Sequence, residues 1–298
     1  MEQRLPVWFK QKPPRAGDTR RVGQLLSDLK LHTVCEGAHC PNIGQCFAAG
    51  TATFMIMGDV CVRNCTFCAV NKGIPLPLDA DEPKHIVEAV RQLGLNYVVI
   101  TCVTRDDLPD GGAGHFAAIT KQLHEAIPGI RVETLVSDFN GNEESIKTAT
   151  EANPEVFAHN LETVPRLYPS VRPMANYQRS LDVLRKAKDI NPDTITKSGL
   201  MLGLGEEQDE VIDVLHDLRR AGCELLSLGQ YLAPSQDHHR VESFITPEKF
   251  VEYEKISMRE GFKGVASAPL VRSSFRAAEL FDHAINFNRI VELPEIST

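Results

Sequence analysis

Short apolar runs alternate with amphipathic stretches between residues 51 and 262. The runs are rich in β-branched and aliphatic side chains, as buried strands are, and the stretches carry apolar residues at helical spacing. We expect strands at 51–59, 96–103, 131–138, 156–163, 195–205 and 225–232. We expect helices at 85–94, 114–127, 143–152, 177–190, 210–222 and 247–261.

A strand followed by a helix, six times over, predicts a parallel sheet with right-handed crossovers. Six units are two fewer than a closed eight-fold barrel needs, so we expect an α/β fold: a partial, open (β/α)6 TIM-like barrel. The barrel would span 51–262, between an N-terminal extension over 1–50 and a C-terminal extension over 263–298. Functional residues of such folds collect at the carboxyl ends of the strands.

The composition narrows the possible classes of protein. The chain is 42% hydrophobic and 24% charged, which is typical of a soluble protein. No apolar run approaches the roughly 18 residues of a membrane span, and no signal core stands at the start, so we expect a cytoplasmic protein. A formal net charge of −8 argues against nucleic-acid binding. The basic arm over 1–34 is either a solvated strap or a surface for an acidic partner, and it contains one predicted short helix at 22–31.

Three cysteines directly after the first strand are the strongest chemical signal. Cys61, Cys65 and Cys68 fall within eight residues, so their thiols must converge on one small object. A cubane of four irons held by three thiolates keeps one iron open for chemistry. A structural zinc site usually needs a second cysteine or histidine pair, and disulfides are not expected in a cytosolic chain. The spacing therefore favours an iron–sulfur cluster.

A second group of three cysteines precedes the first strand. Cys35, Cys40 and Cys46 lie in a stretch with Gly, Pro and Asn that we expect to be an irregular loop. A second cluster is the favoured interpretation, while a zinc site that uses His39, or plain core cysteines, remain alternatives. The other two cysteines, Cys102 and Cys223, stand alone, and we expect both in the core.

Glycines and polar residues stand near the ends of later strands. Gly111 and Gly112 precede a helix and leave its N–H groups open to an anion. Asn160 and Glu162 lie in the fourth strand, where unpaired polar groups are costly unless they face a ligand or one another. Lys197 in the fifth strand either extends outward or points into the barrel mouth.

The CxxxCxxC pattern with Phe67 before its last cysteine resembles the signature of the radical S-adenosylmethionine (SAM) family. The resemblance implies that Cys61, Cys65 and Cys68 hold a 4Fe-4S cluster, whose open iron binds SAM and whose reduced form cleaves it to a 5′-deoxyadenosyl radical. The segment 199–206 is similar to a family element beside the adenine. Taken together, the expected contacts with SAM are Phe67, Gly111, Gly112, Asn160, Glu162, Lys197 and Gly203.

Over its whole length the chain resembles the lipoyl synthase family, whose signatures are CxxxxCxxxxxC, CxxxCxxC and a C-terminal Arg-Ser-Ser element. All three occur here in order, the last one at 272–274. The resemblance implies a second 4Fe-4S cluster on Cys35, Cys40 and Cys46. Its fourth ligand would be Ser274, with Ser273 as the alternative. The local pattern by itself predicts that Ser274 is the N-cap of a following helix.

This resemblance implies a sulfurtransferase that inserts sulfur at C6 and C8 of an octanoyl group bound to a lysine of a carrier protein. Those carbons bear unactivated C–H bonds that acid–base catalysis cannot reach, and the sulfur would come from the second cluster. The implied partners are octanoylated lipoyl-carrier domains, namely E2 subunits of 2-oxoacid dehydrogenases and the glycine cleavage H protein, and a reductant of the ferredoxin or flavodoxin type. Another sulfur-inserting radical SAM enzyme, such as biotin synthase, and a non-catalytic iron–sulfur or zinc-binding module are the alternatives.

Overall fold

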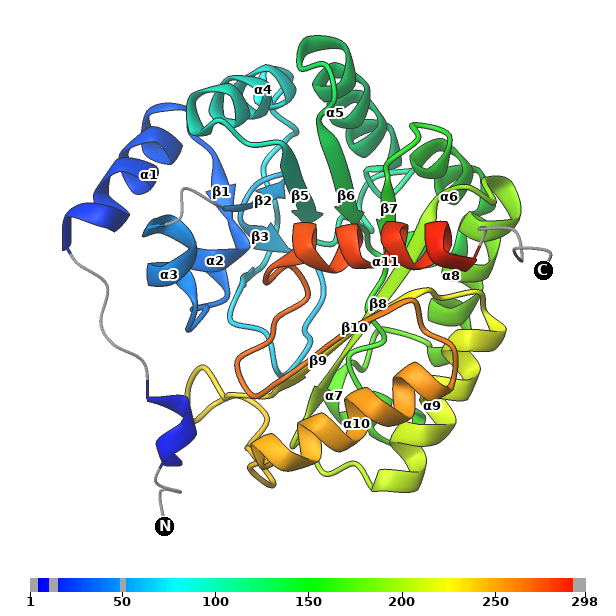
Figure 1. Cartoon of the computed structure of the whole chain (residues 1–298). Helices are drawn as coiled ribbons and strands as arrows, with labels where there is room; N and C mark the ends of the chain where they lie inside the picture. The colour runs from blue at the N-terminus through cyan, green and yellow to red at the C-terminus, as the bar shows by residue number, and fades with distance from the viewer. Residues whose placement is uncertain (1–4, 11–15, 49–51, 292–298) are drawn as a thin grey trace.

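An open barrel of parallel strands, wrapped by helices, makes up most of the molecule (Figure 1). The computed structural model describes residues 5–10, 16–48 and 52–291. Parts of the sequence-based expectations lie outside these residues: positions 1–4, 11–15 and 49–50 of the N-terminal extension, Thr51 at the start of the first strand, and positions 292–298 of the C-terminal extension.

The main sheet of the described residues has eight strands in the order β1-β2-β5-β6-β7-β8-β9-β10. Their bounds are β1 (His32–Thr33), β2 (Thr53–Ile56), β5 (Tyr97–Cys102), β6 (Arg131–Leu135), β7 (Val156–Ala158), β8 (Ile195–Leu202), β9 (Leu225–Gln230) and β10 (Gly264–Ser267). Neighbours are parallel except for β1, which pairs with β2 in the antiparallel sense. The two edge strands β1 and β10 are not paired with each other, so the barrel stays open.

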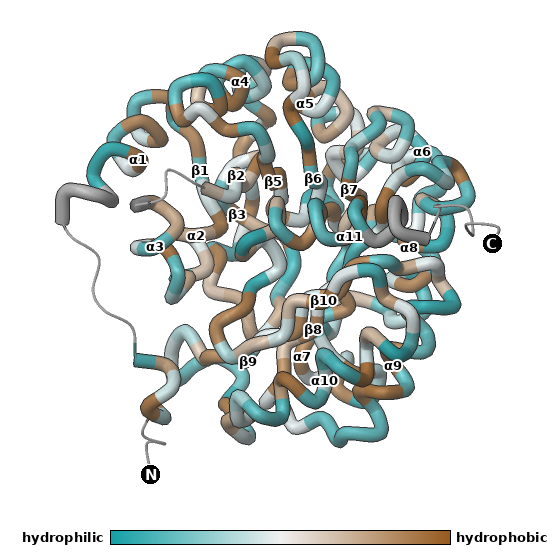
Figure 2. The backbone as a smooth tube through the Cα atoms, in the orientation of Figure 1, coloured by the Kyte–Doolittle hydropathy of each residue, from teal (hydrophilic) through white to brown (hydrophobic). Residues whose placement is uncertain are grey.

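Six helices follow the strands and cover the outer face of the sheet. They are α4 (Glu82–Leu93), α5 (Ala113–Ala126), α6 (Glu143–Thr150), α8 (Tyr177–Ile190), α9 (Gln208–Arg220) and α10 (Pro247–Arg259). Val98 and Ile100 of β5 pack in one cluster with Ile86 of α4 and Phe116 of α5, so alternate residues of the strand face the helices. Figure 2 shows hydrophobic and hydrophilic positions alternating along these outer helices, as amphipathic helices require.

The predicted fold class is confirmed: six strand–helix units form a partial, open barrel, and the boundaries differ from the predicted ones by a few residues. Two short strands of the main sheet were not predicted. β1 comes from the N-terminal extension, and β10 from the C-terminal one. Both are too short for the period of a strand to stand out in the sequence.

The irregular loop expected around Cys35, Cys40 and Cys46 is wrong, because two short helices form there. α2 (Val34–Gly37) begins after Thr33, whose hydroxyl accepts a hydrogen bond from the backbone N–H of Glu36 at 3.3 Å. α3 (Ile43–Ala48) follows, and the preceding α1 (Ala16–Asp28) begins earlier than the predicted 22–31. The remaining short elements are η1 (Val7–Phe9), β3 (Val60–Cys61), β4 (Asn71–Lys72), η2 (Phe139–Gly141), η3 (Pro165–Leu167) and α7 (Tyr168–Val171).

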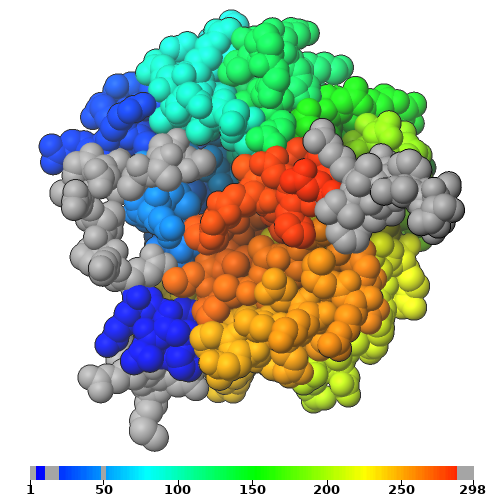
Figure 3. Space-filling model, viewed as in Figure 1, coloured from blue at the N-terminus to red at the C-terminus, as the bar shows by residue number. Residues whose placement is uncertain are grey.

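Helix α11 (Ala277–Val291) packs against the amino-terminal ends of several strands. Its buried side chains Leu280, Phe281 and Ala284 share a cluster with residues from the starts of four strands: Tyr97, Val156, Ile195 and Leu225. In Figure 3 this segment (red) lies between the first half of the chain (cyan to green) and α10 (orange). The expected N-cap role of Ser274 is wrong, since the helix begins three residues later at Ala277. None of the helices among the described residues has both the length and the apolar character of a membrane span.

Candidate active site

A cavity of about 510 Å³ opens at the carboxyl ends of the parallel strands. Residues of both cysteine groups line it: Cys35 and Cys40 from one, and Cys61, Cys65 and Cys68 from the other. Cys46 does not line the cavity, but its thiol lies close enough to those of Cys35 and Cys40 for their charge to raise its pKa. The fold therefore places both groups around one space.

Backbone donors hold the first thiol of the CxxxCxxC loop. Cys61 ends β3, and its Sγ accepts hydrogen bonds from the backbone N–H of Thr104 at 3.3 Å and of Arg63 at 3.5 Å. The middle of the loop is anchored by Thr66, whose N–H donates to the Val171 carbonyl at 3.0 Å. These bonds orient the thiols before any metal binds.

The other group is held by α2, α3 and the turn between them. Cys35 lies in α2, Cys46 lies in α3, and the N–H of Cys40 donates to the Cys35 carbonyl at 3.0 Å. Asn42 Nδ2 in the turn donates to the Leu270 carbonyl at 2.7 Å, which ties this group to the C-terminal segment. Segments more than 200 positions apart in the chain thus meet at the cavity.

Burial makes the thiols difficult to ionise by themselves. It raises the pKa of Cys68 to about 11, and burial with the neighbouring thiols Cys35 and Cys40 raises that of Cys46 to about 11. Metal binding needs thiolates, so the protons leave as the metal enters. All eight cysteines are free thiols.

The donor set fits an iron–sulfur cluster. Within the described residues, no three His, Cys, Asp or Glu side chains lie close enough together to share a single metal ion. Five of the six cysteines of the two groups line the cavity, and a cubane places its thiolates on separate irons.

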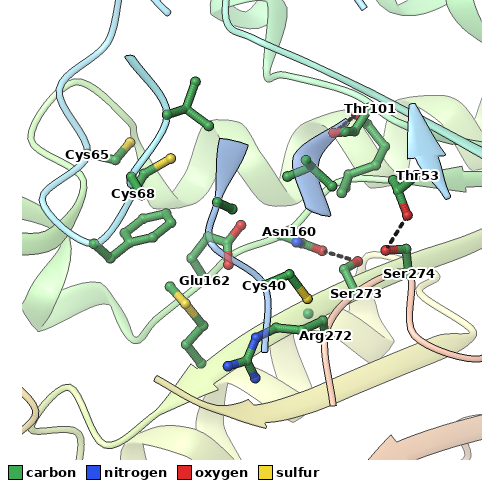
Figure 4. Close-up of a pocket in the computed structure, with 18 of the residues that line it drawn as sticks. Cys40, Thr53, Cys65, Cys68, Thr101, Asn160, Glu162, Arg272, Ser273 and Ser274 are labelled. Carbon is green, nitrogen blue, oxygen red and sulfur yellow. Dashed lines mark hydrogen bonds between the residues drawn. The ribbon is translucent and has the colours of Figure 1, made fainter. Parts of the chain in front are cut away.

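Two arginines, the buried Arg172 and the partly buried Arg272, place positive charge beside the two cysteine groups, which suits a cluster bound by several thiolates. Arg172 is 8% exposed, and its charge lowers the pKa of Cys65 against the larger effect of burial. Its Nη1 donates to the Leu161 carbonyl at 3.0 Å, but its buried Nε has no hydrogen-bond partner in the described structure. Arg272 lies near Cys40, as Figure 4 shows, and burial lowers its pKa. The sequence offered little signal for Arg172, which lies outside every predicted element.

A third arginine, Arg63, joins the cysteine loop to the sheet. Its Nε donates to Asp106 at 2.7 Å, and its Nη2 donates to Asp138 at 2.6 Å. Arg179 reaches the other oxygen of Asp138 at 2.7 Å. Burial would raise the pKa of Asp138, but the hydrogen bonds and charge of Arg63 outweigh it and hold that pKa well below its usual range. Arg63 occupies one of the variable positions of CxxxCxxC, so the sequence motif assigns it no role, and only the fold shows its contacts.

Several predicted site residues do face the cavity. Phe67, Asn160, Glu162 and both serines line it. Ser273 Oγ donates to Asn160 Oδ1 at 3.1 Å, whereas Ser274 Oγ accepts from Thr53 Oγ1 at 2.8 Å (Figure 4). Glu162 has a positive φ of 66°, and burial raises the pKa of its carboxyl. Such strain in a non-glycine residue is common at binding sites.

The predicted glycines do not line the cavity. At the start of α5 the Asp110 side chain accepts hydrogen bonds from the N–H groups of Gly112 at 2.9 Å and Gly114 at 2.8 Å. The anion at this helix terminus is therefore the chain's own carboxylate. Gly203 has a φ of 97°, and a Cβ there would overlap Gln230. The contacts of Gly111, Gly112 and Gly203 with SAM remain predictions.

Neither orientation expected for Lys197 is found. Its side chain is fully buried, and its Nζ pairs with Glu133 at 2.8 Å, while Tyr97 donates to the same carboxylate at 2.6 Å. Lys197 does not line the cavity. A buried lysine needs such a partner, because an unpaired charge in the barrel interior would be very costly.

Cys223 is fully buried as expected, whereas Cys102 is partly buried and packs against the core but also faces the cavity. Cys102 ends β5, lines the cavity, and lies near Cys61. Burial, followed by the charge of Cys61, raises its pKa to about 12.

Comparison with known proteins agrees with this site. The model of the radical SAM superfamily matches residues 55–218, which include the CxxxCxxC loop and most of the barrel. A crystal structure of methylornithine synthase superposes with a TM-score of 0.55 at 14% identity, covering 85% of this chain and 75% of that one. Coproporphyrinogen III oxidase from Escherichia coli, described as a radical SAM enzyme, gives 0.50 at 14% identity over 72% of this chain and 55% of that one. The chain is a radical SAM protein.

More similar relatives define its place within that superfamily. A lipoyl synthase of Caldanaerobacter subterraneus subsp. tengcongensis is 55% identical over 93% of this chain and 97% of that protein. Lipoyl synthases of Caldicellulosiruptor bescii and Thiobacillus denitrificans are 52% and 51% identical, over 96% and 92% of this chain and 98% and 89% of those proteins. The chain belongs to the lipoyl synthase family.

Proposed function

We propose that this chain inserts sulfur into a protein-bound octanoyl group by radical chemistry, and that it uses two 4Fe-4S clusters facing a single cavity. The observation that carries the proposal is the convergence of two cysteine groups and Ser274 on one space at the carboxyl ends of the strands. An enzyme that makes a radical at one site and delivers sulfur from another needs both within reach of the same substrate carbon.

Cys61, Cys65 and Cys68 would hold the cluster that binds SAM. When bound and reduced, that cluster supplies the electron that cleaves SAM and so provides the radical for hydrogen abstraction. Arg172 offers a buried cation with a free Nε beside Cys65, which suits the carboxylate of SAM. Phe67, Asn160 and Glu162 line the same part of the cavity and would contact the rest of SAM.

Cys35, Cys40, Cys46 and Ser274 would hold the second cluster, which serves as the sulfur-donating substrate. A serine oxygen is a harder ligand than a thiolate and matches the iron of such a cluster less well. The position of the two serines supports the choice of Ser274, since it contacts Thr53 near Cys35, whereas Ser273 contacts Asn160.

Apolar side chains line the cavity between these polar groups. Leu135, Val136 and Met201 are among them. Such a lining accommodates an octanoyl chain and excludes water that would interfere with radical chemistry. Carbons 6 and 8 of the chain, which bear unactivated C–H bonds, would lie in this part of the cavity.

The wider assignments are part of the same proposal. The chain comprises an extension with the second cluster loop (1–50), the barrel (51–262) and an extension with the Arg-Ser-Ser element (263–298). It acts in the cytoplasm on octanoylated E2 subunits of 2-oxoacid dehydrogenases and on the H protein, with electrons from a ferredoxin or flavodoxin. The contributions of β1 and β10 to the sheet support a structural role for both extensions.

An anaerobic turnover assay tests the proposal. The reconstituted chain is expected to contain about eight irons, four in each of two cubanes, and to convert an octanoylated carrier peptide to a product heavier by two sulfur atoms. Mass spectrometry of the peptide measures the sulfur. Zinc in place of iron, or SAM cleavage without added sulfur on the peptide, would contradict the proposal.

A further inference from the structure

Thr53 lies between two residues that come from opposite ends of the chain. It begins β2, is 6% exposed, and lines the cavity. Its Oγ1 donates to Ser274 Oγ at 2.8 Å. Thr53 also lies beside the Cys35 thiol. Thr53 is thus next to two proposed ligands of the same cluster.

The surrounding contacts fix this arrangement. β1 pairs Thr33 with Phe54 in the antiparallel sense, which places the α2 cysteine next to the start of β2. On the other side, the segment before Ser274 packs on β9 so closely that a Cβ at Gly229 would overlap the Val271 carbonyl. Asn42 binds the Leu270 carbonyl and holds the same segment to the cysteine turn.

Ser274 itself needs an external constraint. A serine side chain has three staggered rotamers, and only one of them directs Oγ to a given point. A serine oxygen also binds iron of this kind more weakly than a thiolate does, so little binding free energy is available to select the rotamer. The hydrogen bond from Thr53 selects it before the metal binds, which lowers the cost of ordering.

We propose that Thr53 is a positioning residue for the second cluster: its hydroxyl holds Ser274 Oγ beside the Cys35 thiol so that both can bind one cubane. This inference rests on the proposed function, because it takes Ser274 as a ligand. Thr53 itself binds no iron in this proposal.

The test compares Thr53→Val, which removes the hydroxyl but keeps the shape, with Thr53→Ser, which keeps the hydroxyl. Each variant is reconstituted anaerobically, and its clusters are measured by iron content and Mössbauer spectroscopy. Occupancy of the second cluster, or the yield of doubly sulfurated peptide, should fall about tenfold or more in Thr53→Val and recover in Thr53→Ser. SAM cleavage at the other cluster should stay within about twofold of the original chain, because the two sites use different ligands.

Thr134→Val is a matched control. Thr134 is a fully buried strand residue in β6 whose hydroxyl has no partner among the described residues, and it does not line the cavity. The same substitution there should leave the second cluster unchanged. In a Ser274→Ala background, Thr53→Val should add nothing, because the residue acts through Ser274.

The outcomes separate this inference from the proposed function. Unchanged second-cluster spectra in Thr53→Val would overturn the inference alone, provided that the original chain contains both clusters. Loss of SAM cleavage together with the second cluster would also overturn it, since that pattern means a general effect on the fold. A single cluster in the original chain would instead refute the proposed function.

Discussion

Three arginines near the cavity, Arg172, Arg272 and Arg63, differ in the charges that surround them. Arg172 stands beside the CxxxCxxC thiols and Arg272 beside Cys40, while Arg63 is neutralised by two aspartates. Of these three, Arg172 alone has a buried guanidinium nitrogen without a hydrogen-bond partner among the described residues. Buried polar groups are rarely left in this state, so the residue is the best candidate for binding an anionic part of SAM.

The first prediction concerns Arg172. We expect Arg172→Gln to weaken SAM binding about tenfold or more, because a charge-assisted hydrogen bond is lost, and Arg172→Lys to weaken it less. Equilibrium binding of SAM to the reconstituted chain measures the effect, with iron content as a check on the cluster. Arg166→Gln is the control, since Arg166 is half exposed and pairs with Glu210 at 2.7 Å. Equal affinity for SAM in Arg172→Gln and the original chain would refute this role.

The second prediction concerns His159. It is 2% exposed, Nδ1 binds the Val136 carbonyl at 2.9 Å, and Nε2 contacts Ser180 at 3.0 Å. Burial, aided by the charge of Arg172, lowers its pKa from 6.5 to about 4. Between these pH values the unfolded state binds a proton that the folded state does not, so this contribution to stability is complete above about pH 6.5 and falls as the pH decreases towards 4.

As the pH falls over that range, protonation of His159 would lower the free energy of unfolding by roughly 3 kcal/mol at most. Denaturant unfolding of the original chain and of His159→Gln, at several pH values, measures it. The free energy of unfolding should depend less on pH in the variant. Parallel curves for the two proteins would show that His159 does not titrate in this way.

At the scale of elements, the site depends on a segment without regular structure. Residues 268–276 run from β10 to α11 and carry the Arg-Ser-Ser element. The segment packs closely on Gly229 of β9, shares two backbone hydrogen bonds with that strand at its start (Ala268 N–H to the Leu228 carbonyl and Gln230 N–H to the Pro269 carbonyl), and accepts a hydrogen bond from Asn42. Its position therefore depends on the absence of a side chain at Gly229.

The third prediction follows from this close packing. We expect Gly229→Ala to displace the segment that carries Ser274, because its Cβ would overlap the Val271 carbonyl, which cannot move independently of its chain. Iron of the second cluster and sulfur transfer should fall about tenfold or more. Gly23→Ala in α1 is the control: a Cβ there meets nothing within 4 Å, and stability should be equal or slightly higher. Normal second-cluster content in Gly229→Ala would show that the segment can shift without loss.

On the scale of the whole molecule, both ends of the chain contribute to one cavity. The N-terminal extension supplies β1 and α2, and the C-terminal extension supplies β10, Ser274 and the helix that packs on the opposite end of the barrel. The barrel thus supplies one proposed cluster site, and the two extensions together supply the other. This division makes the two sites separable by mutation.

The fourth prediction uses this separation. We expect Cys65→Ala to abolish SAM cleavage but to retain about four irons, because the other site keeps all its ligands. Cys40→Ala should retain SAM cleavage and lose sulfur transfer, because the sulfur donor is missing. Iron content, 5′-deoxyadenosine formation and peptide mass measure the three quantities. If either substitution removes both clusters, the two sites are not independent.

Much of the fold could be predicted because its signals are local. Strand and helix periods over 51–262 predicted the six units and the open barrel, and spacing alone indicated six candidate cysteines, five of which line the cavity. The strands β1 and β10 could not be predicted, since each is defined by its partner strand rather than by its own residues. Helices flank Cys40 where a loop was expected. Thr33 caps α2, but the glycines and proline of this stretch favoured a loop and obscured that capping signal.

The sequence by itself determined the strand–helix alternation, the two cysteine groups and the serine element, because spacing and residue type carry that information within a few tens of positions. Only the tertiary structure decided which residues share the cavity. It brought Thr53 to Ser274, left Arg172 with a free donor, placed Cys102 beside Cys61 and paired Lys197 with Glu133 in the interior. These contacts join residues far apart in the chain, and burial and charge pairing select them only once the barrel has formed.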